Sequence, residues 1–300
     1  LYQVGDRVSI MRDGTLVGTF TTQELTMNRM IELIAGRKIE NLYPRNRLAE
    51  KGETVLEIRD CTGSKFSHVN LNVRAGEIVG LSGLVGAGRT ELARAIFGAD
   101  HYQSGEILLC GKKVPRNSTA RAVKSGIGLL PEDRKVQGLS LNYSIRENIV
   151  IATLDKISKG GMTNILKEKK LCAEYVKRLS IATPTVEKPA GFLSGGTQQK
   201  VVIAKWLSAD LKLFIFDEPT RGIDVGAKSE IYELMDGLVH QGAAILMISS
   251  DLPEILGMSD RVYVMSQGRI TGELKHSEAT QEKILTLAYG QNLEGTEAIQ

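Results

Sequence analysis

Cysteine and long apolar runs are scarce in this 300-residue sequence, and each scarcity excludes a class of protein. The 3 cysteines, Cys61, Cys110 and Cys172, lie far apart and lack the spacing of a metal site. We therefore expect reduced thiols in a cytosolic protein rather than a disulfide framework. No apolar run approaches the ~20 residues that a helix needs to cross a bilayer. If the protein acts at a membrane, it must dock on another protein that spans it.

An excess of charge of one sign is also lacking. The 38 basic residues stand against 35 acidic residues, which gives a net charge of +3. This balance does not indicate a nucleic-acid partner. The content of 42% hydrophobic and 24% charged residues is typical of a soluble globular α/β protein, and the length permits one large domain or two ordinary ones.

The first forty residues repeat a segment near the end of the sequence. The stretch that starts at Asp6 aligns without a gap on the stretch that starts at Asp260, an offset of 254 (260 minus 6), with 10 identical residues up to Gly36 and Gly290. Such self-similarity indicates a tandem duplication. We predict that residues 1–40 are the closing hairpin and last helix of a preceding, truncated copy. Residues 41–53 are then a polar linker, residues 54–290 the second copy and residues 291–300 a C-terminal tail.

A glycine-rich loop stands between a predicted strand at 77–81 and a helical pattern at 92–96. Gly83 and Gly88 have the four-residue gap of the phosphate-binding motif G-x-x-x-x-G-K-[ST], but Arg89 replaces the lysine. We expect Thr90 to hold Mg²⁺, and we expect the wide arginine fork to stabilise developing charge less well than lysine. The residues predicted to bind nucleotide here are Gly83, Leu84, Val85, Gly86, Ala87, Gly88, Arg89 and Thr90.

Two further motifs lie close together downstream. In the octet Leu193-Ser-Gly-Gly-Thr-Gln-Gln-Lys200, two glycines and a serine precede a helical pattern and leave backbone N–H groups free for an anion. The apolar run 213–216 then ends in Asp217 and Glu218. A strand that ends in two carboxylates predicts one ligand for Mg²⁺ and one base for a water molecule.

The octet, joined to Asp217-Glu-Pro-Thr220, resembles the signature and strand motifs of ATP-binding cassette (ABC) ATPases. The resemblance implies an α/β fold with a P-loop NTPase core, in which a mostly parallel sheet with helices has an antiparallel edge. Residues 55–58 and 69–73 are predicted to be strands of that edge. The resemblance also implies an inserted helical subdomain over about 139–190. ATP and Mg²⁺ are the implied cofactors, with Thr90 and Asp217 as metal ligands and Glu218 as the base.

Three positions depart from the family's pattern. Where the family has lysine, glutamine and histidine, this sequence has Arg89, Glu132 and Ser250. These three residues and Asp217 belong to the nucleotide-binding side of the chain's own site. ABC domains work as head-to-tail pairs, so the resemblance places the signature residues on the ATP of the preceding copy. Our hypothesis is a degenerate own site that hydrolyses ATP poorly, beside an intact signature acting in trans through Ser194, Gly195 and Gly196.

Gly88-Arg-Thr90 and Pro131-Glu-Asp-Arg-Lys135 narrow the resemblance to the ATP-binding subunits of bacterial monosaccharide importers of the ribose, galactose, xylose and autoinducer-2 type. That resemblance implies a peripheral protein on the cytoplasmic face of the inner membrane. Its implied partners are the preceding ABC domain of the same chain, integral-membrane permease subunits and, indirectly, a sugar-binding protein, with no nucleic acid.

Other functions remain as alternatives. These are an ABC-superfamily ATPase that is not linked to transport, a non-hydrolysing nucleotide-binding regulatory module, and a P-loop kinase or GTPase. The signature octet disfavours the kinase and the GTPase. The isolated fragment is expected to be inactive or very weak as an ATPase.

Overall fold

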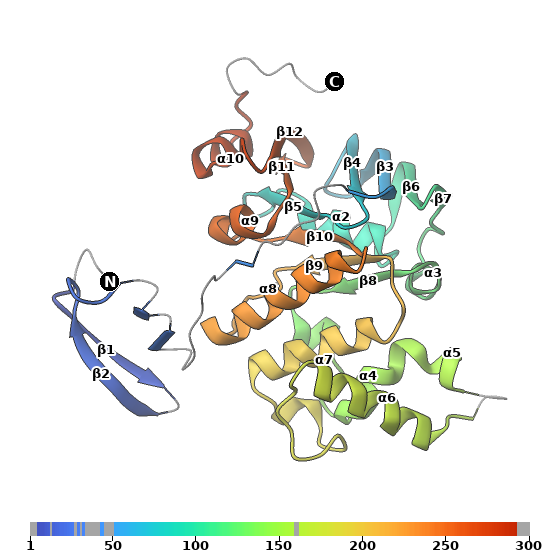
Figure 1. The fold of residues 1–300 in the computed structure, drawn as a ribbon. Coiled ribbons are helices and arrows are strands. Elements are labelled where there is room, and N and C mark those ends of the chain that lie inside the picture. The colour runs from blue at the N-terminus through green and yellow to red at the C-terminus, as the bar shows by residue number, and fades with distance from the viewer. Residues whose placement is uncertain are drawn as a thin grey trace.

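The computed structural model describes residues 5–12, 14–26, 29, 30, 32, 33, 43, 44, 51–158 and 162–292. A six-stranded sheet lies in the main body, with the strand order β12-β11-β5-β10-β9-β8 (Figure 1). Its neighbouring strands run parallel, except that β11 and β12 form an antiparallel hairpin at one edge. The strands are β5 (Ile78–Gly83), β8 (Ile127–Leu130), β9 (Leu213–Asp217), β10 (Ala244–Ile248), β11 (Arg261–Ser266) and β12 (Arg269–Lys275).

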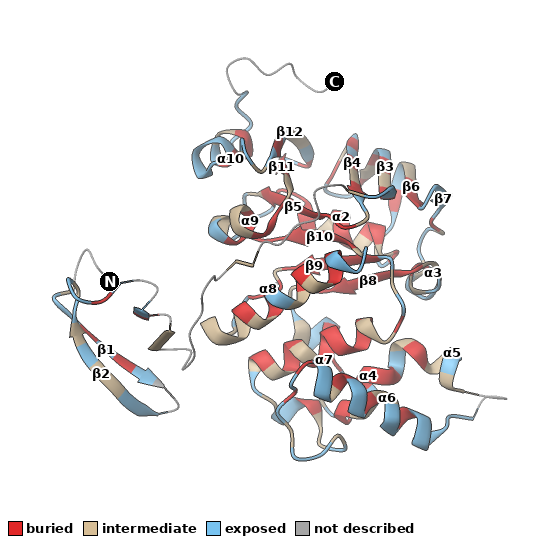
Figure 2. Ribbon diagram, viewed as in Figure 1, coloured by how far each residue is buried: buried red, intermediate tan, exposed pale blue. Residues whose placement is uncertain are grey.

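The central strands are apolar along their whole length because helices cover the sheet. Every residue of β9 and of β10 is buried, as expected for parallel strands covered on both faces. Figure 2 shows buried residues concentrated in this sheet and on one side of the helices. The surrounding helices are α2 (Arg89–Ile96), α3 (Thr119–Ser125), α8 (Val225–His240), α9 (Leu252–Met258) and α10 (Gln281–Ala288).

The strands predicted at 55–58 and 69–73 are present, but they form a separate sheet instead of an edge of the parallel one. This second sheet has the order β4-β3-β6-β7 and is antiparallel. Strand β4 alternates between buried and less buried residues, so the side chains on one of its faces are packed inside the protein and those on the other face are not. Helix α2 contacts β3 of this sheet and β5 and β9 of the central one. The strands are β3 (Thr54–Gly63), β4 (Val69–Arg74), β6 (Tyr102–Leu109) and β7 (Lys112–Lys113).

A lobe of helices follows β8 and the π-helical turn η1 (Arg134–Gly138), and Figure 1 shows it below the sheets. A capping box between Ser144 and Glu147 begins its first helix, and Asn164 caps the longest one. No helix in the part of the chain that the structure describes is both long and apolar enough to cross a membrane. The lobe contains α4 (Ile145–Val150), η2 (Ile151–Thr153), α5 (Leu154–Ile157), α6 (Ile165–Arg178), η3 (Ala190–Phe192) and α7 (Gly195–Leu207).

The hairpin of β1 (Arg7–Arg12) and β2 (Thr15–Thr21) has the same strand pairing as the hairpin of β11 and β12. Arg7 pairs with Thr21 and Arg261 pairs with Lys275, an offset of 254 (261 minus 7), and in both hairpins the register shifts after the fourth residue of the first strand. An irregularity at the same place adds a structural correspondence to the sequence repeat. Most of the helix predicted to follow the first hairpin, most of linker 41–53 and tail residues 293–300 lie outside the described residues.

Candidate functional site

The residues predicted to bind nucleotide lie at one edge of the central sheet. Strand β10 lies between β5 and β9, and β8 follows β9. Because these strands are parallel, their carboxyl ends meet at the same edge. Strand β5 leads into the phosphate loop, Gly83–Thr90, and β9 ends at Asp217. Ser250 and Glu132 each follow the end of their strand by two residues. The fold therefore gathers these residues from four separate parts of the sequence.

The phosphate loop requires glycine where it enters α2. Gly88 is the N-cap of this helix and has a φ of 97°, in the left-handed region. A Cβ atom at this position would lie 2.4 Å from the carbonyl oxygen of Lys65, so any larger residue would be strained and would clash. Three residues earlier in the same loop, Val85 is 94% exposed. The backbone thus has a loop and helix N-terminus of the kind that binds phosphate.

Arg89 occupies the lysine position of the motif, and its side chain points into the protein. Its Nη1 atom donates a hydrogen bond to the carbonyl oxygen of Ser249 at 3.0 Å, and the residue is only 8% exposed. Burial lowers the pKa of the Arg89 guanidinium, while the nearby carboxylates of Glu218 and Asp217 raise it. The cation is therefore held beside the two carboxylates at the strand ends.

Asp217 has the features of a metal ligand. It is 2% exposed, and its Oδ1 atom is buried without a hydrogen-bond partner. Burial raises the pKa of its carboxyl to about 6, and the hydrogen bond donated by the Thr90 side chain opposes that rise. A buried carboxylate oxygen that lacks a partner fits a site for Mg²⁺ shared with phosphate. The described residues contain no group of three or more His, Cys, Asp or Glu side chains that could hold a metal ion.

Replacing Asp217 by asparagine should stabilise the chain at pH 7 without Mg²⁺ by about 3 kcal/mol. The wild-type carboxyl has a pKa of about 6 when folded, against about 3.9 when unfolded. Its contribution to stability therefore falls as the pH rises from about 4 to 6, and the full cost of about 3 kcal/mol remains above pH 6. Urea unfolding at pH 5 and pH 7 measures this difference. The asparagine variant should also lose the stabilisation by Mg²⁺, and a variant less stable than wild type at pH 7 would contradict the assignment.

Glu218, the predicted base, has a strained backbone. Its φ is 50°, which is uncommon for a residue other than glycine and is typical of functional sites. Its N–H group donates to the carbonyl oxygen of Ile248 at 2.9 Å, which holds the loop against β10. Ser250, at the position where the family has histidine, donates from Oγ to Glu218 Oε2 at 3.2 Å. Ser250 is therefore a hydrogen-bond partner of Glu218.

Glu132 lies two residues beyond the end of β8 and forms an ion pair with Arg221, which follows β9. The two side chains are 39% and 64% exposed, so the pair is partly solvated. The acid that replaces the family's glutamine thus contacts a cation of this chain in the structure.

The signature residues lie away from the phosphate loop. Ser194 is exposed, and its Oγ accepts a hydrogen bond from the N–H of Thr197 at 3.3 Å, which caps helix α7. Helix α7 belongs to the helical lobe, whereas α2 lies by the sheets (Figure 1). A Cβ atom on Gly196 would lie 2.8 Å from the Cβ of Ala227, near the start of α8. The predicted site residues therefore form two groups, one around the phosphate loop and one at the N-terminus of α7.

Two polar residues near the signature were missed in the sequence analysis. Arg134 donates to the backbone carbonyls of the loop after β9, and Gln199 donates to the carbonyl of Pro219 at 2.7 Å. Both residues stand within motifs that had been recognised, but nothing in the spacing of those motifs indicated these contacts. Partners that lie 20 to 88 residues apart in the chain cannot be paired from local patterns.

Comparisons with known proteins identify the family of the chain. Residues 66–221 match the ABC transporter family model. The ribose import ATP-binding protein RbsA 1 of Streptomyces avermitilis is 49% identical over 290 residues, which cover 96% of this chain and 55% of that protein. The ribose import ATP-binding protein RbsA of Bacillus subtilis is 48% identical over 291 residues, which cover 97% of this chain and 59% of that protein. The chain thus spans little more than half the length of these relatives.

Solved structures share the fold. The ATP-binding cassette MJ1267 of an ABC transporter superposes with a TM-score of 0.67 at 20% identity, over 78% of this chain and 98% of that one. The cassette MJ0796, in a dimeric post-hydrolysis state bound to ADP and Pi, superposes with a TM-score of 0.64 at 22% identity, over 74% of this chain and 98% of that one. Together with the family model, which matches more than half of the sequence, these similarities show that the chain belongs to the ABC transporter family.

Proposed function

We propose that this chain is the C-terminal part of an ATPase subunit that energises monosaccharide import through an ABC permease. In this proposal residues 1–40 end a preceding ABC domain and residues 41–53 are the linker. Residues 54–290 are the second nucleotide-binding domain, with a helical subdomain at about 139–190, and residues 291–300 are a tail. The repeated hairpin register and the longer relatives support this organisation.

The chain's own site binds ATP and Mg²⁺ but hydrolyses ATP slowly. The observation that carries this part of the proposal is the inward position of Arg89, which donates to the Ser249 carbonyl and is 8% exposed. A guanidinium held there is withdrawn from the phosphates, where a lysine would place its ammonium group. The backbone of the phosphate loop, Thr90 and Asp217 would still hold MgATP, since Mg²⁺ prefers oxygen ligands shared with phosphates.

The signature turn, Ser194–Gly196, acts on ATP held by the preceding domain. Its N–H groups stand at the N-terminus of a 13-residue helix, where negative charge is stabilised. Two large apolar side chains next to the two groups of site residues are exposed, Phe192 at 74% and Val85 at 94%. Exposed apolar residues beside such motifs are what a second domain would cover in a head-to-tail pair.

Ribose is the first candidate for the imported sugar because the Streptomyces avermitilis and Bacillus subtilis relatives are both named ribose import proteins. A Rhizobium etli relative, 48% identical over 97% of this chain, is named a putative ribose/galactose/methyl galactoside import protein, so these sugars are the next candidates. We place the subunit on the cytoplasmic face of the inner membrane, bound to permease subunits that a sugar-binding protein supplies. A cavity of about 770 Å³, lined by Phe97, Pro131, Ile151 and Trp206, lies between α2 and the helical lobe and suits a permease segment.

Replacing Arg89 by alanine in the full-length protein should lower ATP turnover and sugar uptake by less than about fivefold. The reason is that most turnover occurs at the other site, to which this chain contributes only its signature turn. ATPase assays on the purified subunit–permease complex and uptake of labelled ribose by vesicles measure both effects. The chain alone should show no measurable ATP turnover.

Three results would contradict the proposal. If Arg89→Ala abolished turnover, the own site would be the catalytic one. Brisk hydrolysis by the chain alone would rule out a slow own site. If the wild-type complex hydrolysed no ATP under any condition, a purely regulatory nucleotide-binding module would replace the ATPase assignment.

A further inference from the structure

The Arg134 side chain lies between the signature turn and the loop after β9, residues 218–224. Arg134 Nη1 donates to the carbonyl oxygen of Arg221 at 2.9 Å, and Nη2 donates to that of Gly222 at 3.3 Å. A Cβ atom built on Gly195 would lie 2.7 Å from Arg134 Nη2 and 3.1 Å from the Gly222 carbonyl oxygen. The guanidinium therefore fills the space between this loop and the signature turn.

The segment that carries Arg134 holds the same loop in a second way. Glu132, two residues earlier, forms the ion pair with Arg221 described above. A partly exposed ion pair of this kind contributes little energy, but it fixes the direction of two side chains at the place where Arg134 binds the backbone. One short segment after β8 thus contacts both the side chain and the carbonyl of Arg221.

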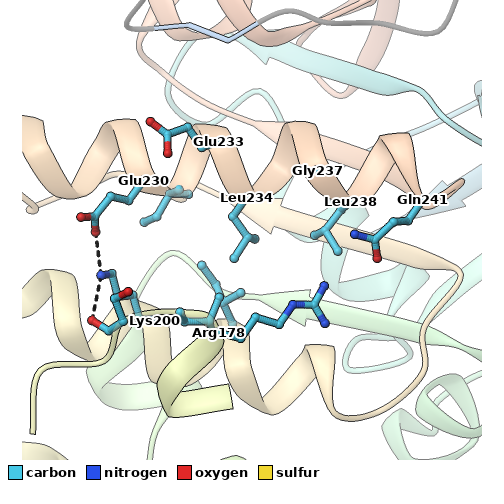
Figure 3. A pocket seen from close by; sticks show the side chains of 12 residues that line it. Arg178, Lys200, Glu230, Glu233, Leu234, Gly237, Leu238 and Gln241 are labelled. Carbon is cyan, nitrogen blue, oxygen red and sulfur yellow. Dashed lines mark hydrogen bonds and ion pairs between the residues drawn. The ribbon is translucent and has the colours of Figure 1, made fainter. Parts of the chain in front are cut away.

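Two residues in the first turns of helix α7 also contact the loop after β9 and helix α8. The buried Gln199 Nε2 donates to the carbonyl oxygen of Pro219 at 2.7 Å, just before the loop turns toward Asp224. Lys200, the last residue of the signature octet, forms an ion pair with Glu230 of α8 at 2.6 Å, and Figure 3 shows the two side chains meeting across the gap between α7 and α8. The first turns of α7 are therefore connected to the loop and to α8 at several points.

We propose that Arg134 is a positioning residue that sets the distance between the signature turn and the loop 218–224, so that the turn is held in the position from which it meets the neighbouring domain's ATP. Asp224 caps α8 by accepting from the N–H of Ala227 at 2.9 Å, so its place depends on the loop that Arg134 binds. Arginine is required because two nitrogens of one planar fork reach two successive carbonyls, which a lysine ammonium cannot do with the same geometry. This inference rests on the proposed function of the signature turn.

The test uses Arg134→Lys in the full-length protein with its permease. We expect ATP turnover to fall at least about tenfold, because small displacements of positioned groups have large effects on rate. Binding of MgATPγS should keep its stoichiometry, with a Kd within about threefold of wild type. A merely structural role would instead lower the stoichiometry, the melting temperature and turnover together. Arg121→Lys, at an exposed position on α3, is the matched control and should leave turnover unchanged.

A double-mutant cycle with Gly195→Ala provides the second measurement. Each single change disturbs the same contact, so the double variant should be little worse than the poorer single variant. Independent, multiplying effects would overturn the inference, and so would wild-type turnover in Arg134→Lys. If Gly195→Asp abolishes turnover while Arg134→Lys does not change it, only the positioning role fails. If Gly195→Asp has no effect, the proposed function itself fails.

Discussion

Replacing Gly195 by aspartate in the full-length protein should lower ATP turnover at least about a hundredfold, the effect of losing a preorganised donor to developing charge. The new Cβ would lie 2.7 Å from Arg134 Nη2 and 3.1 Å from the carbonyl oxygen of Gly222, so the guanidinium that binds the loop would have to move. The added carboxylate would also bring negative charge to the helix N-terminus that we assign to a phosphate. Steady-state ATPase assays on the complex with its permease measure the loss.

Gly237→Asp is the matched control for this change. Gly237 also lies in a helix, α8, and a Cβ atom at this position would meet nothing within 4 Å. The same substitution there should change turnover by less than about twofold. Comparable damage from the two substitutions would show that the signature turn has no special role, and the proposal that it acts in trans would then be withdrawn.

Replacing Glu254 by alanine should lower the free energy of unfolding of the chain by about 3 to 5 kcal/mol. Glu254 is 1% exposed and accepts a hydrogen bond from the Thr220 hydroxyl at 3.0 Å and others from the hydroxyls of Ser249 and Tyr232. Burial raises its pKa, and these three hydroxyls oppose that rise. Without the carboxyl group, all three buried donors lose an acceptor. Urea unfolding followed by circular dichroism measures the loss.

The same change should affect the site, because Thr220 and Ser249 lie next to the ends of β9 and β10. These loops position Glu218 and Ser250, so binding of MgATPγS should weaken as the loops relax. Glu174→Ala, at an exposed position on α6, is the control and should change stability by less than about 0.5 kcal/mol. An equal loss of stability in both variants would contradict the role of Glu254.

Much of the fold could be predicted because its signals are local. The parallel strands 77–81 and 213–216 are short apolar runs, and each leads directly into a motif whose residues must be contiguous in the chain. The separate antiparallel sheet was not predicted, because β3 pairs with β6, which starts 39 residues after β3 ends (102 minus 63). Such a pairing depends on how α2 packs between the two sheets, which sequence alternation does not reveal.

The sequence by itself determined the family of this chain and predicted its phosphate loop, its strand carboxylates and its signature turn, since each depends on residue types at fixed spacing. Only the tertiary structure decided what the side chains at these positions contact. Arg89 reaches Ser249, 160 residues away, because β10 lies beside β5, and Arg134 reaches Arg221, 87 residues away, because β9 lies beside β8. These neighbours result from the order of strands in the sheet, which packing of the whole chain selects and no local pattern encodes.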